Sequence, residues 1–431
     1  MAAYLTQRYM SGKSKPGWHE RWGHLPPSLQ ASANSRSRIW VHAVSAGEVV
    51  AAVPILKELR RILPEYQLVL SVITPAGHEM AEQQAIPYID DLFYFPFDMP
   101  WVARRVVQAI RPDVFVSLES EMWPNLLHEL KRFGARTVMV NGRISERSFR
   151  RTKKIASGLF RWMFSNMDKL LMQSAMDAQR VRELGRISEP GRVVVMGNSK
   201  FDQAIARLSA EETIALRRSL YLPDSAPVFV AGSTRSMDEE REVIAAYIAM
   251  RAKFPDLCLI VAPRQIDRAG DVESALQKAG LTSVRRSAMK QENSKQDFFK
   301  QDAAIKVLIL DTMGELANIY AIASFAFVGN SFPPVIKGGG QNLLQPLAHG
   351  KPVLFGPYTA TTRAEVALVL ESDVGFQVTN GIELAEKGLM LLKNAPLCAE
   401  ISARATALIA ANQGVSRRYA EAVAEMAYEK K

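Results

Sequence analysis

Cysteine is scarce in this chain of 431 residues. Only Cys258 and Cys398 occur, far apart and without neighbouring histidines. This argues against a disulfide framework or a zinc site and fits a reducing compartment. No stretch reaches the roughly 18 uninterrupted apolar residues that a membrane-spanning helix needs. The amino terminus also lacks an apolar core long enough for a signal peptide.

Basic residues are plentiful by contrast, with 54 Lys and Arg against 44 Asp and Glu, a net charge of +10. This balance favours an anionic partner, whether nucleic acid, a phosphorylated substrate or an acidic membrane surface. The first 30 residues mix aromatic and basic side chains. Such an arm suits a membrane surface, and an irregular arm packed on its own domain is the equal alternative.

Short apolar runs alternate with helix patterns along the whole chain, which predicts βαβ units around parallel sheets. We therefore expect an α/β fold of two Rossmann-like doubly wound domains, residues 1–205 and 206–431. The last helix either belongs to the second domain or crosses back to the first. Residues 285–301 read as a polar surface loop. The predicted strands are RIWVHAV, YQLVLSVI, LFYFPF, VFVSLE, RTVMVNG, KLLMQS and RVVVMG, then PVFVAGS, LCLIVAP, KVLILD, FAFVGN and PVLFG.

Acidic residues follow two strands of the first half, where ligands of open α/β sheets collect. Glu48 comes directly after the small-residue turn Ser45-Ala46-Gly47, and it either caps the following helix or acts in catalysis. Glu119 and Glu121 follow another strand, beside Trp123. They are catalytic, or they cap the helix that begins at Pro124.

Strand ends of the second half carry features that suit a phosphate or a nucleotide. Gly338 to Gly340 open a loop before a helix expected near Asn342, an arrangement that favours an anion or is a plain flexible turn. Ser233 and Thr234 either bind a phosphate or sugar or cap a helix. Arg264 grips a phosphate or forms a surface ion pair. Met313 and Gly314 accept a base or ribose, or belong to a helix cap at Asp311 or Thr312.

A basic stretch from Arg143 to Arg161 is interleaved with aromatic residues. It suits nucleic acid or a phosphorylated lipid at a membrane, or it is a solvated helix face.

Motifs spread over most of the chain resemble those of the 3-deoxy-D-manno-octulosonic acid (Kdo) transferases of lipopolysaccharide assembly. Single motifs are modest, but the ordered set is specific and runs from about GWHERWG to beyond Pro357. The motifs are HAVSAGEV, TPAG, PFDMPWVARR, LESEMWPNLL, NGRISERS, QSAMDAQR, GNSKFD, AGST, APR, DTMGEL, FVGNS and GGGQNLLQPLAHGKPVLFGP. The resemblance implies the GT-B fold, in which two Rossmann-like domains face a central cleft.

The resemblance also implies a reaction, the transfer of Kdo from CMP-Kdo to a hydroxyl of the lipid A precursor, lipid IVA. The transfer inverts the anomeric centre and uses no cofactor and no metal. Glu48 stands where the family has its general base, and we expect the helix N-terminus to keep its carboxylate ionised. On the acceptor side the resemblance points to Ser45, Gly47, Glu119, Glu121, Arg143 and Arg147.

On the donor side, the second domain is expected to hold CMP-Kdo. The implied contacts are Ser233, Thr234, Arg264, Met313, Gly314, Gly338, Gly339, Gly340, Asn342 and Gln345. The chain departs from the family pattern at Arg235, Gln265, Gln341 and Gln345, and these departures leave donor affinity and donor identity open.

The sequence also departs from the family at its start, where a longer hydrophobic anchor is usual. We expect peripheral or N-terminal attachment to an anionic membrane, at the cytoplasmic face of the inner membrane. The alternatives are a GT-B glycosyltransferase with another nucleotide sugar, a sugar-nucleotide epimerase, and a donor-impaired membrane-binding protein. Nucleic-acid binding ranks last because no recognised module for it is present.

Overall fold

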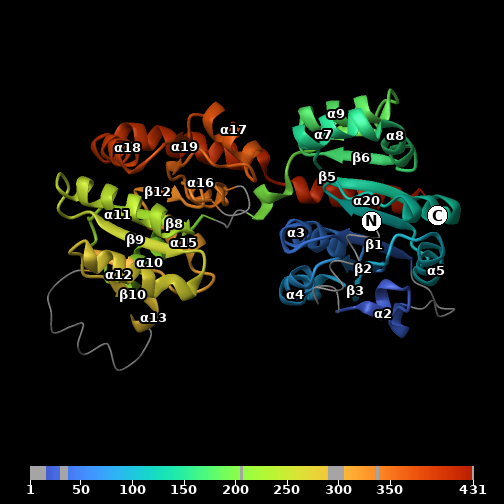
Figure 1. Cartoon of the computed structure of the whole chain (residues 1–431), viewed down its shortest axis with the longest axis horizontal. Coiled ribbons are helices and arrows are strands. Elements are labelled where there is room, and N and C mark those ends of the chain that lie inside the picture. The colour runs from blue at the N-terminus through green and yellow to red at the C-terminus, as the bar shows by residue number, and fades with distance from the viewer. Residues whose placement is uncertain (1–15, 30–36, 204–206, 290–304, 336–338, 430–431) are drawn as a thin grey trace. The chain divides into compact units, whose positions relative to one another are not determined.

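The computed structural model describes residues 16–29, 37–203, 207–289, 305–335 and 339–429 (Figure 1). The chain divides into two compact units, residues 1–203 with 412–431, and residues 204–411. Each unit contains one seven-stranded sheet in which every pair of neighbouring strands is parallel. The predicted α/β fold with two Rossmann-like halves is therefore confirmed.

In the first unit the strand order is β3-β2-β1-β4-β5-β6-β7. The strands are β1 (Arg38–Ala43), β2 (Gln67–Val72), β3 (Asp91–Tyr94), β4 (Val114–Leu118), β5 (Arg136–Gly142), β6 (Lys169–Met172) and β7 (Val193–Val195). The helices are α2 (Trp18–Arg21), α3 (Ala46–Ile62), α4 (Pro75–Gln84), α5 (Pro100–Ile110), α6 (Pro124–Phe133), α7 (Glu146–Ile155), α8 (Ser157–Ser165), α9 (Ala175–Gly185) and α20 (Val415–Tyr428).

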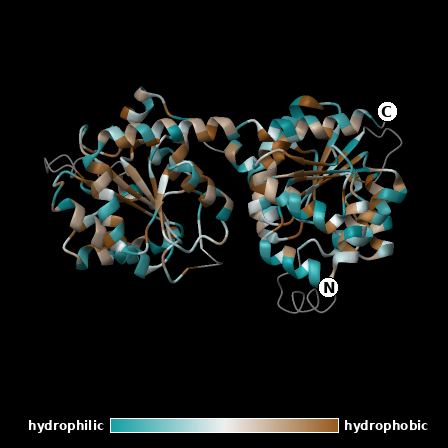
Figure 2. Cartoon of the chain, turned by 90° about the horizontal axis from the view of Figure 1, so that it is seen from above, coloured by the Kyte–Doolittle hydropathy of each residue, from teal (hydrophilic) through white to brown (hydrophobic). Residues whose placement is uncertain are grey.

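Alternate residues of β1 pack on opposite faces of this sheet. Ile39 and Val41 join a core formed with α3, α4 and α20, whereas Trp40 joins the core formed with α5, α6 and α9. Every residue of β1 is buried, because helices cover both faces, and this explains why the strand reads as an unbroken apolar run. Figure 2 shows hydrophobic residues gathered in the strands inside each unit.

The last helix, α20, belongs to the first unit. In Figure 1 its red ribbon lies among elements drawn in blue and teal. Its buried Tyr419 and Val423 pack in the same core as α3. Asp202 accepts hydrogen bonds from the backbone N–H groups of Gly414 (2.6 Å) and Ser416 (2.5 Å), which fixes the start of the helix.

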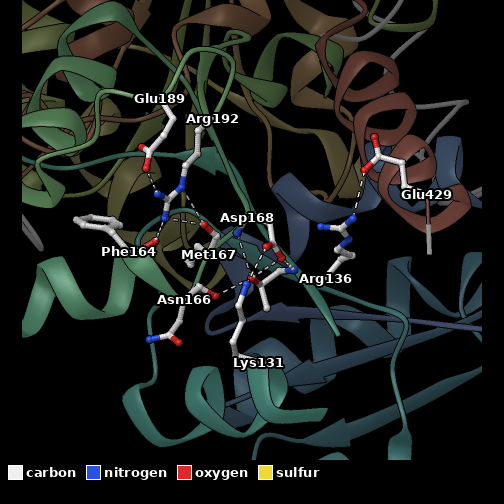
Figure 3. A network of polar contacts seen from close by, with 10 residues as sticks. Lys131, Arg136, Phe164, Asn166, Met167, Asp168, Glu189, Arg192 and Glu429 are labelled. Atoms are coloured by element: carbon white, nitrogen blue, oxygen red, sulfur yellow. Dashed lines mark hydrogen bonds and ion pairs between the residues drawn. The ribbon is translucent and has the colours of Figure 1, made fainter. Parts of the chain in front are cut away.

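The amino ends of strands β5 to β7 are held by polar contacts, shown in Figure 3. Asp168 accepts a hydrogen bond from the Thr137 N–H (2.8 Å) and pairs with Lys131 (3.2 Å). Arg192 donates to the carbonyl oxygens of Phe164 and Met167. These bonds satisfy backbone groups at the amino ends of these strands and so stabilise that end of the sheet.

In the second unit the strand order is β10-β11-β9-β8-β12-β13-β14. The strands are β8 (Val228–Thr234), β9 (Cys258–Pro263), β10 (Val284–Arg285), β11 (Val307–Ile309), β12 (Phe325–Val328), β13 (Val353–Phe355) and β14 (Gly375–Gln377). The helices are α10 (Ala210–Ser219), α11 (Met237–Arg251), α12 (Ala269–Lys278), α13 (Arg286–Met289), α15 (Leu316–Ile319), α16 (Leu344–Ala348), α17 (Arg363–Glu371), α18 (Gly381–Lys393) and α19 (Ala395–Asn412).

The prediction of a polar loop at residues 285–301 is wrong for its first part. Arg285 belongs to β10, and residues 286–289 form α13. Arg285 pairs with Glu273, Arg286 pairs with Glu315, and Met289 is buried. These partners lie in other elements, so the charged residues stabilise an edge of the domain. Residues 290–301 lie outside the described part of the chain.

Within the described residues, no helix combines the length and the apolar character that crossing a membrane requires.

Candidate functional site

The carboxyl ends of β1 and β4 form the centre of the first candidate site. The chain runs from β1 to β2 and β3 on one side and then returns to place β4 on the other side. Such a reversal of strand order is where open α/β sheets bind ligands. The segment from Val44 to Glu48 follows β1, and Glu119 to Glu121 follow β4, as the sequence predicted.

Glu48 lies in the first turn of α3 and bonds back to the turn that precedes the helix. Its carboxylate accepts the backbone N–H of Val44 (2.8 Å) and the hydroxyl of Ser45 (3.2 Å). Ser45 is the N-cap residue, but its side chain does not cap the helix. Glu48 therefore stabilises the turn before the helix in the way that a capping residue does. Its side chain is also partly exposed, so it remains accessible to a substrate. Gly47 is exposed, with open space around the position of a Cβ.

The acid–base state of Glu48 differs from the expectation. The pKa of its carboxyl is raised to about 8, mainly by burial, and the charges of Glu119 and Glu121 add to the effect. The hydrogen bonds from Val44 and Ser45 lower the pKa but do not compensate. The expectation that the helix N-terminus keeps Glu48 ionised is therefore wrong, because desolvation and like charges outweigh the helix dipole.

Glu121 shares this environment, and burial together with the charge of Glu119 raises its pKa to about 7. Glu119 is held in a left-handed conformation (φ 55°), and its N–H donates to the carbonyl oxygen of Val140 (3.0 Å). Three carboxyl groups thus act on one another electrostatically at this sheet edge. A group that keeps its proton near neutral pH is suited to proton transfer.

The alternative that Glu119 or Glu121 caps the helix after Pro124 is wrong. Asp98 provides the cap, since its carboxylate accepts the N–H groups of Asn125 (3.2 Å) and Leu126 (2.8 Å). Asp98 precedes a different helix in the sequence, and no local spacing reveals this contact. Because Asp98 caps this helix, Glu119 and Glu121 are not needed as capping residues.

One buried polar side chain beside the site, His42, was not predicted from the sequence. His42, at the end of β1, stacks on Phe95 with ring centroids 3.8 Å apart, and burial lowers its pKa to about 3. Its Nδ1 lies 3.1 Å from the carbonyl oxygen of Ser71. Its Nε2 and the Nε1 of Trp123 are buried without a hydrogen-bond partner in the described structure. The histidine is therefore a neutral member of the core at neutral pH.

The basic stretch of the first unit forms α7, α8 and the turn before them. Arg143 follows β5 and is half-buried, while Arg147 is exposed on α7. Neither makes a hydrogen bond or ion pair through its side chain within the described residues, whereas Arg150 and Arg180 both pair with Glu146. Exposed apolar side chains accompany the free cations along these helices, namely Ile155 (79% exposed), Leu159 and Trp162.

The second candidate site is the corresponding reversal between β8 and β12. The turn after β8 and the loop after β12 are joined by Glu239, a buried residue of α11. Its carboxylate accepts four backbone N–H groups, from Arg235 (3.0 Å), Asn330 (2.9 Å), Ser331 (2.9 Å) and Phe332 (3.1 Å). Three of these four partners lie more than ninety residues away in the sequence, so the contacts of Glu239 follow from the topology and not from a local pattern.

The predicted donor-binding residues after β8 and β9 differ in exposure and in whether their polar groups are already bound within the protein. Thr234 is fully buried, and its hydroxyl donates to Glu240 (2.8 Å), so the prediction that it binds a donor through this group is wrong. Ser233 is half-buried in a left-handed conformation (φ 60°). Ser236, not Ser233 or Thr234, caps α11. Arg264 is exposed, has no ion-pair partner among the described residues, and is fixed through its N–H to the Thr234 carbonyl oxygen (2.9 Å).

The glycine loop is constrained by contacts within the protein. Gly339 and Gly340 have φ values of 78° and 93°, and a Cβ would lie 2.2 Å from the Tyr358 carbonyl oxygen and 2.5 Å from the Thr362 hydroxyl oxygen. Glycine is thus required here by packing. Gly338 lies outside the described residues.

The helix after this loop begins at Leu344, close to the predicted start near Asn342. It has only five residues, so its N-terminus offers little dipole to an anion. The amide oxygen of Asn342 accepts the Leu344 N–H (2.9 Å), while its side chain is exposed. Gln345 is half-buried within the helix.

The turn after β11 exposes Met313 (76% exposed) next to Gly314, whose φ is 82°. The predicted helix cap at Asp311 or Thr312 is wrong. Asp311 instead accepts the N–H (2.8 Å) and the hydroxyl (2.5 Å) of Ser287, while Thr312 donates to Glu315. These bonds fix the turn and leave Met313 at the surface.

Among the residues that the structure describes, no group of three or more His, Cys, Asp and Glu side chains is arranged to hold a metal ion.

The family described as 3-Deoxy-D-manno-octulosonic-acid transferase (kdotransferase) matches residues 16–203. A 3-deoxy-D-manno-octulosonic acid transferase of Bordetella pertussis is 30% identical over 416 residues, which are 94% of this chain and 92% of that protein. A bifunctional glycosyltransferase/methyltransferase of Fusobacterium nucleatum is 33% identical over 360 residues, 83% of this chain. The chain spans only about half of that relative, 52% of its length.

Two solved structures share the fold at low sequence identity. A glycosyltransferase from Rickettsia africae has a TM-score of 0.57 and 14% identity, covering 91% of this chain and 99% of that one. The UDP-GlcNAc 2-epimerase of Neisseria meningitidis has a TM-score of 0.60 and 9% identity, covering 91% and 100%. At these identities the likeness concerns the fold alone, and transferases and epimerases share it.

Proposed function

The chain belongs to the family of 3-deoxy-D-manno-octulosonic acid (Kdo) transferases, and we propose that it transfers Kdo from CMP-Kdo to a lipid A precursor, lipid IVA. The acceptor oxygen attacks the anomeric carbon, the bond from that carbon to the CMP phosphate oxygen breaks, and CMP leaves. Attack opposite the leaving group inverts the anomeric centre. The proposed chemistry uses no metal or cofactor.

Glu48 is the proposed general base, which takes the proton of the acceptor hydroxyl as the new bond forms. The observation that carries this proposal is its raised pKa, about 8, at the carboxyl end of β1. A carboxylate with this pKa is a much stronger base than an ordinary glutamate. At pH 7 about one molecule in ten of the free protein holds Glu48 ionised. The reactive fraction therefore increases with pH.

The acceptor is proposed to bind the first unit. Arg143 and Arg147 are the proposed partners of the phosphate groups of the lipid A precursor. This assignment is supported by their guanidinium groups, which have no partner within the described residues. Ser45 and Gly47 border Glu48, and we assign them to the acceptor hydroxyl. Burial mainly raises the pKa of Glu48, and the charges of Glu119 and Glu121 add to this effect. In this proposal the two glutamates also contact the acceptor sugar.

The protein is proposed to act at the cytoplasmic face of the inner membrane, bound peripherally or by its amino terminus. Exposed Ile155, Leu159 and Trp162 lie on helices that also carry unpaired basic side chains. Apolar side chains among cations are the pattern that anionic bilayers bind. Residues 1–15 of the proposed membrane-facing arm lie outside the described structure.

The second unit is proposed to hold the donor. Arg264 and Ser233 lie at the strand ends next to the β8–β12 reversal, and Met313 and Gly314 follow β11. We assign the phosphate to Arg264 and the base and ribose to the exposed turn at Met313. Gly339, Gly340, Asn342 and Gln345 complete the proposed site.

Product mass tests the proposal directly. Incubation with CMP-Kdo, generated in place, and a tetraacylated lipid A precursor should add one or more Kdo residues to the lipid. The number of added residues is read from the mass spectrum. Recovery of unchanged lipid, with a Kdo transferase of known activity as the positive control, would refute the proposed reaction.

Another nucleotide-sugar donor is the second candidate, because neutral Gln345 and Gln341 stand where the family pattern has charged or titratable side chains. Competition separates the two proposals. CMP should inhibit transfer at lower concentration than UDP or GDP if CMP-Kdo is the donor. The reverse order would favour the second candidate.

A further inference from the structure

Arg235 carries a guanidinium group that the protein itself does not use. It lies directly after β8, before the N-cap residue Ser236 of α11. Its Nε is buried and has no hydrogen-bond partner within the described residues. A buried N–H donor without a hydrogen-bond partner destabilises the free protein, and a bound acceptor would relieve this.

The nearest carboxylates in the sequence are already occupied. Glu239 accepts four backbone N–H groups. Glu240 binds Arg268 through both of its oxygens (3.0 and 2.6 Å) and also accepts the Thr234 hydroxyl. Asp238 pairs with Arg241. The three acids of the first turn of α11 therefore do not provide a counter-ion for Arg235.

The backbone around Arg235 is fixed firmly. Its own N–H donates to Glu239 (3.0 Å), and the same carboxylate oxygen accepts the Asn330 N–H from the loop after β12. The carbonyl oxygen of the preceding Thr234 accepts the N–H of Arg264. Arg235 and Arg264 therefore follow the carboxyl ends of the neighbouring parallel strands β8 and β9, and this hydrogen bond links the two segments. Neither has an ion-pair partner among the described residues.

We propose that Arg235 is a donor-binding residue that holds the phosphate of the nucleotide sugar together with Arg264. The inference rests on the proposed function and extends it, because residue 235 departs from the family pattern and no role was assigned to it. The turn after the central strand at a strand-order reversal is where Rossmann-type domains bind phosphates. A planar guanidinium matches two phosphate oxygens at once, and its affinity for them does not depend on titration.

Binding of CMP and of cytidine to the purified full chain tests the proposal without any acceptor. Arg235→Gln should weaken CMP binding by about 10-fold or more, the loss expected for one charged hydrogen-bonded pair. It should leave the weaker binding of cytidine unchanged, because cytidine has no phosphate. Arg235→Lys should restore part of the affinity, since lysine keeps the positive charge but cannot bind two phosphate oxygens at once as a guanidinium does. The matched control is Arg241→Gln, six residues further on the exposed side of α11.

Inorganic phosphate separates this inference from the proposed function. Millimolar phosphate should raise the melting temperature of the wild type and of Arg241→Gln, and should raise that of Arg235→Gln clearly less. This holds even if the true donor is not CMP-Kdo. The inference is overturned if Arg235→Gln binds CMP as the wild type does, or, in a protein that binds no CMP, if phosphate stabilises all three proteins equally. Absence of Kdo transfer by the wild type refutes only the proposed function.

Discussion

The carboxylate of Glu48 accepts a hydrogen bond from the backbone N–H of Val44, 2.8 Å away. The bond joins the end of β1 to the first turn of α3 and fixes the carboxylate at the strand-order reversal. It also means that Glu48 has a structural role besides its proposed chemical role. Substitutions at this position must separate the two.

Glu48→Gln and Glu48→Ala separate these roles. Glutamine keeps an oxygen for the Val44 N–H but cannot take a proton, so Kdo transfer should fall by roughly 10²-fold or more with little change in melting temperature. Alanine removes the hydrogen bond as well and should cost about 1 kcal/mol of stability in addition. Thermal unfolding and a transfer assay provide the two readouts. Glu58→Gln, on the same helix and paired with Arg61, should behave as the wild type.

Stability should depend on pH through the same carboxyl group. In the unfolded chain Glu48 loses its proton near its ordinary pKa of 4.5, whereas in the folded protein it keeps the proton until about pH 8. Folding therefore retains a proton within this window, and stability decreases as the pH rises through it. Glu121 contributes in the same direction up to about pH 7.

Urea unfolding between pH 5 and pH 8.5 measures this dependence. Glu48→Gln has no carboxyl to titrate, so its stability relative to the wild type should increase with pH. Parallel stability curves for the two proteins would show that Glu48 has an ordinary pKa in the folded state.

Substitution of Glu239 should strongly reduce the stability of the second unit. Glu239→Gln replaces one acceptor oxygen with an NH2 group, which opposes two of the four backbone N–H groups now bound. We expect a loss of about 2 kcal/mol or more. Hydrogen exchange should accelerate at Asn330, Ser331 and Phe332. The matched control, Asp238→Asn, alters only an exposed ion pair with Arg241 and should change neither; equal effects would refute the role of Glu239.

Membrane binding should depend on the exposed apolar residues of α7 and α8. The combined substitution of Ile155, Leu159 and Trp162 by serine removes the side chains that would enter the bilayer, so binding to anionic vesicles should fall by about 10-fold or more. CMP binding should stay unchanged. Ile382→Ser, on the exposed side of α18 (72% exposed), is the control. Vesicle binding that survives the triple substitution would place the membrane contact elsewhere.

Local patterns were sufficient to predict most of the fold. All five longest strands of the two sheets, among them β5 and β8, coincide with apolar runs read from the sequence. The short strands β10 and β14 were missed, since two or three residues with partly exposed side chains leave no periodic signal. Arg285 was assigned to a loop because its partner Glu273 lies twelve residues away on another element.

The candidate site was predictable in position but not in its electrostatics. Glu48, Glu119 and Glu121 were selected because each follows a strand, and parallel topology brings such ends to one edge. The raised pKa of Glu48 depends on burial and on charges more than seventy residues away in sequence, which local spacing does not contain. The capping role of Asp98 and the four bonds of Glu239 are likewise products of the topology.

The pH dependence of transfer by the wild type and by Glu48→Gln tests the central assignment most directly. With the donor saturating, kcat/KM for the lipid acceptor should rise with pH and level off above an inflection near pH 8, where Glu48 ionises. The residual activity of Glu48→Gln should lack that inflection. An inflection that persists unchanged in Glu48→Gln, or a variant as active as the wild type, would contradict the assignment of Glu48 as the base.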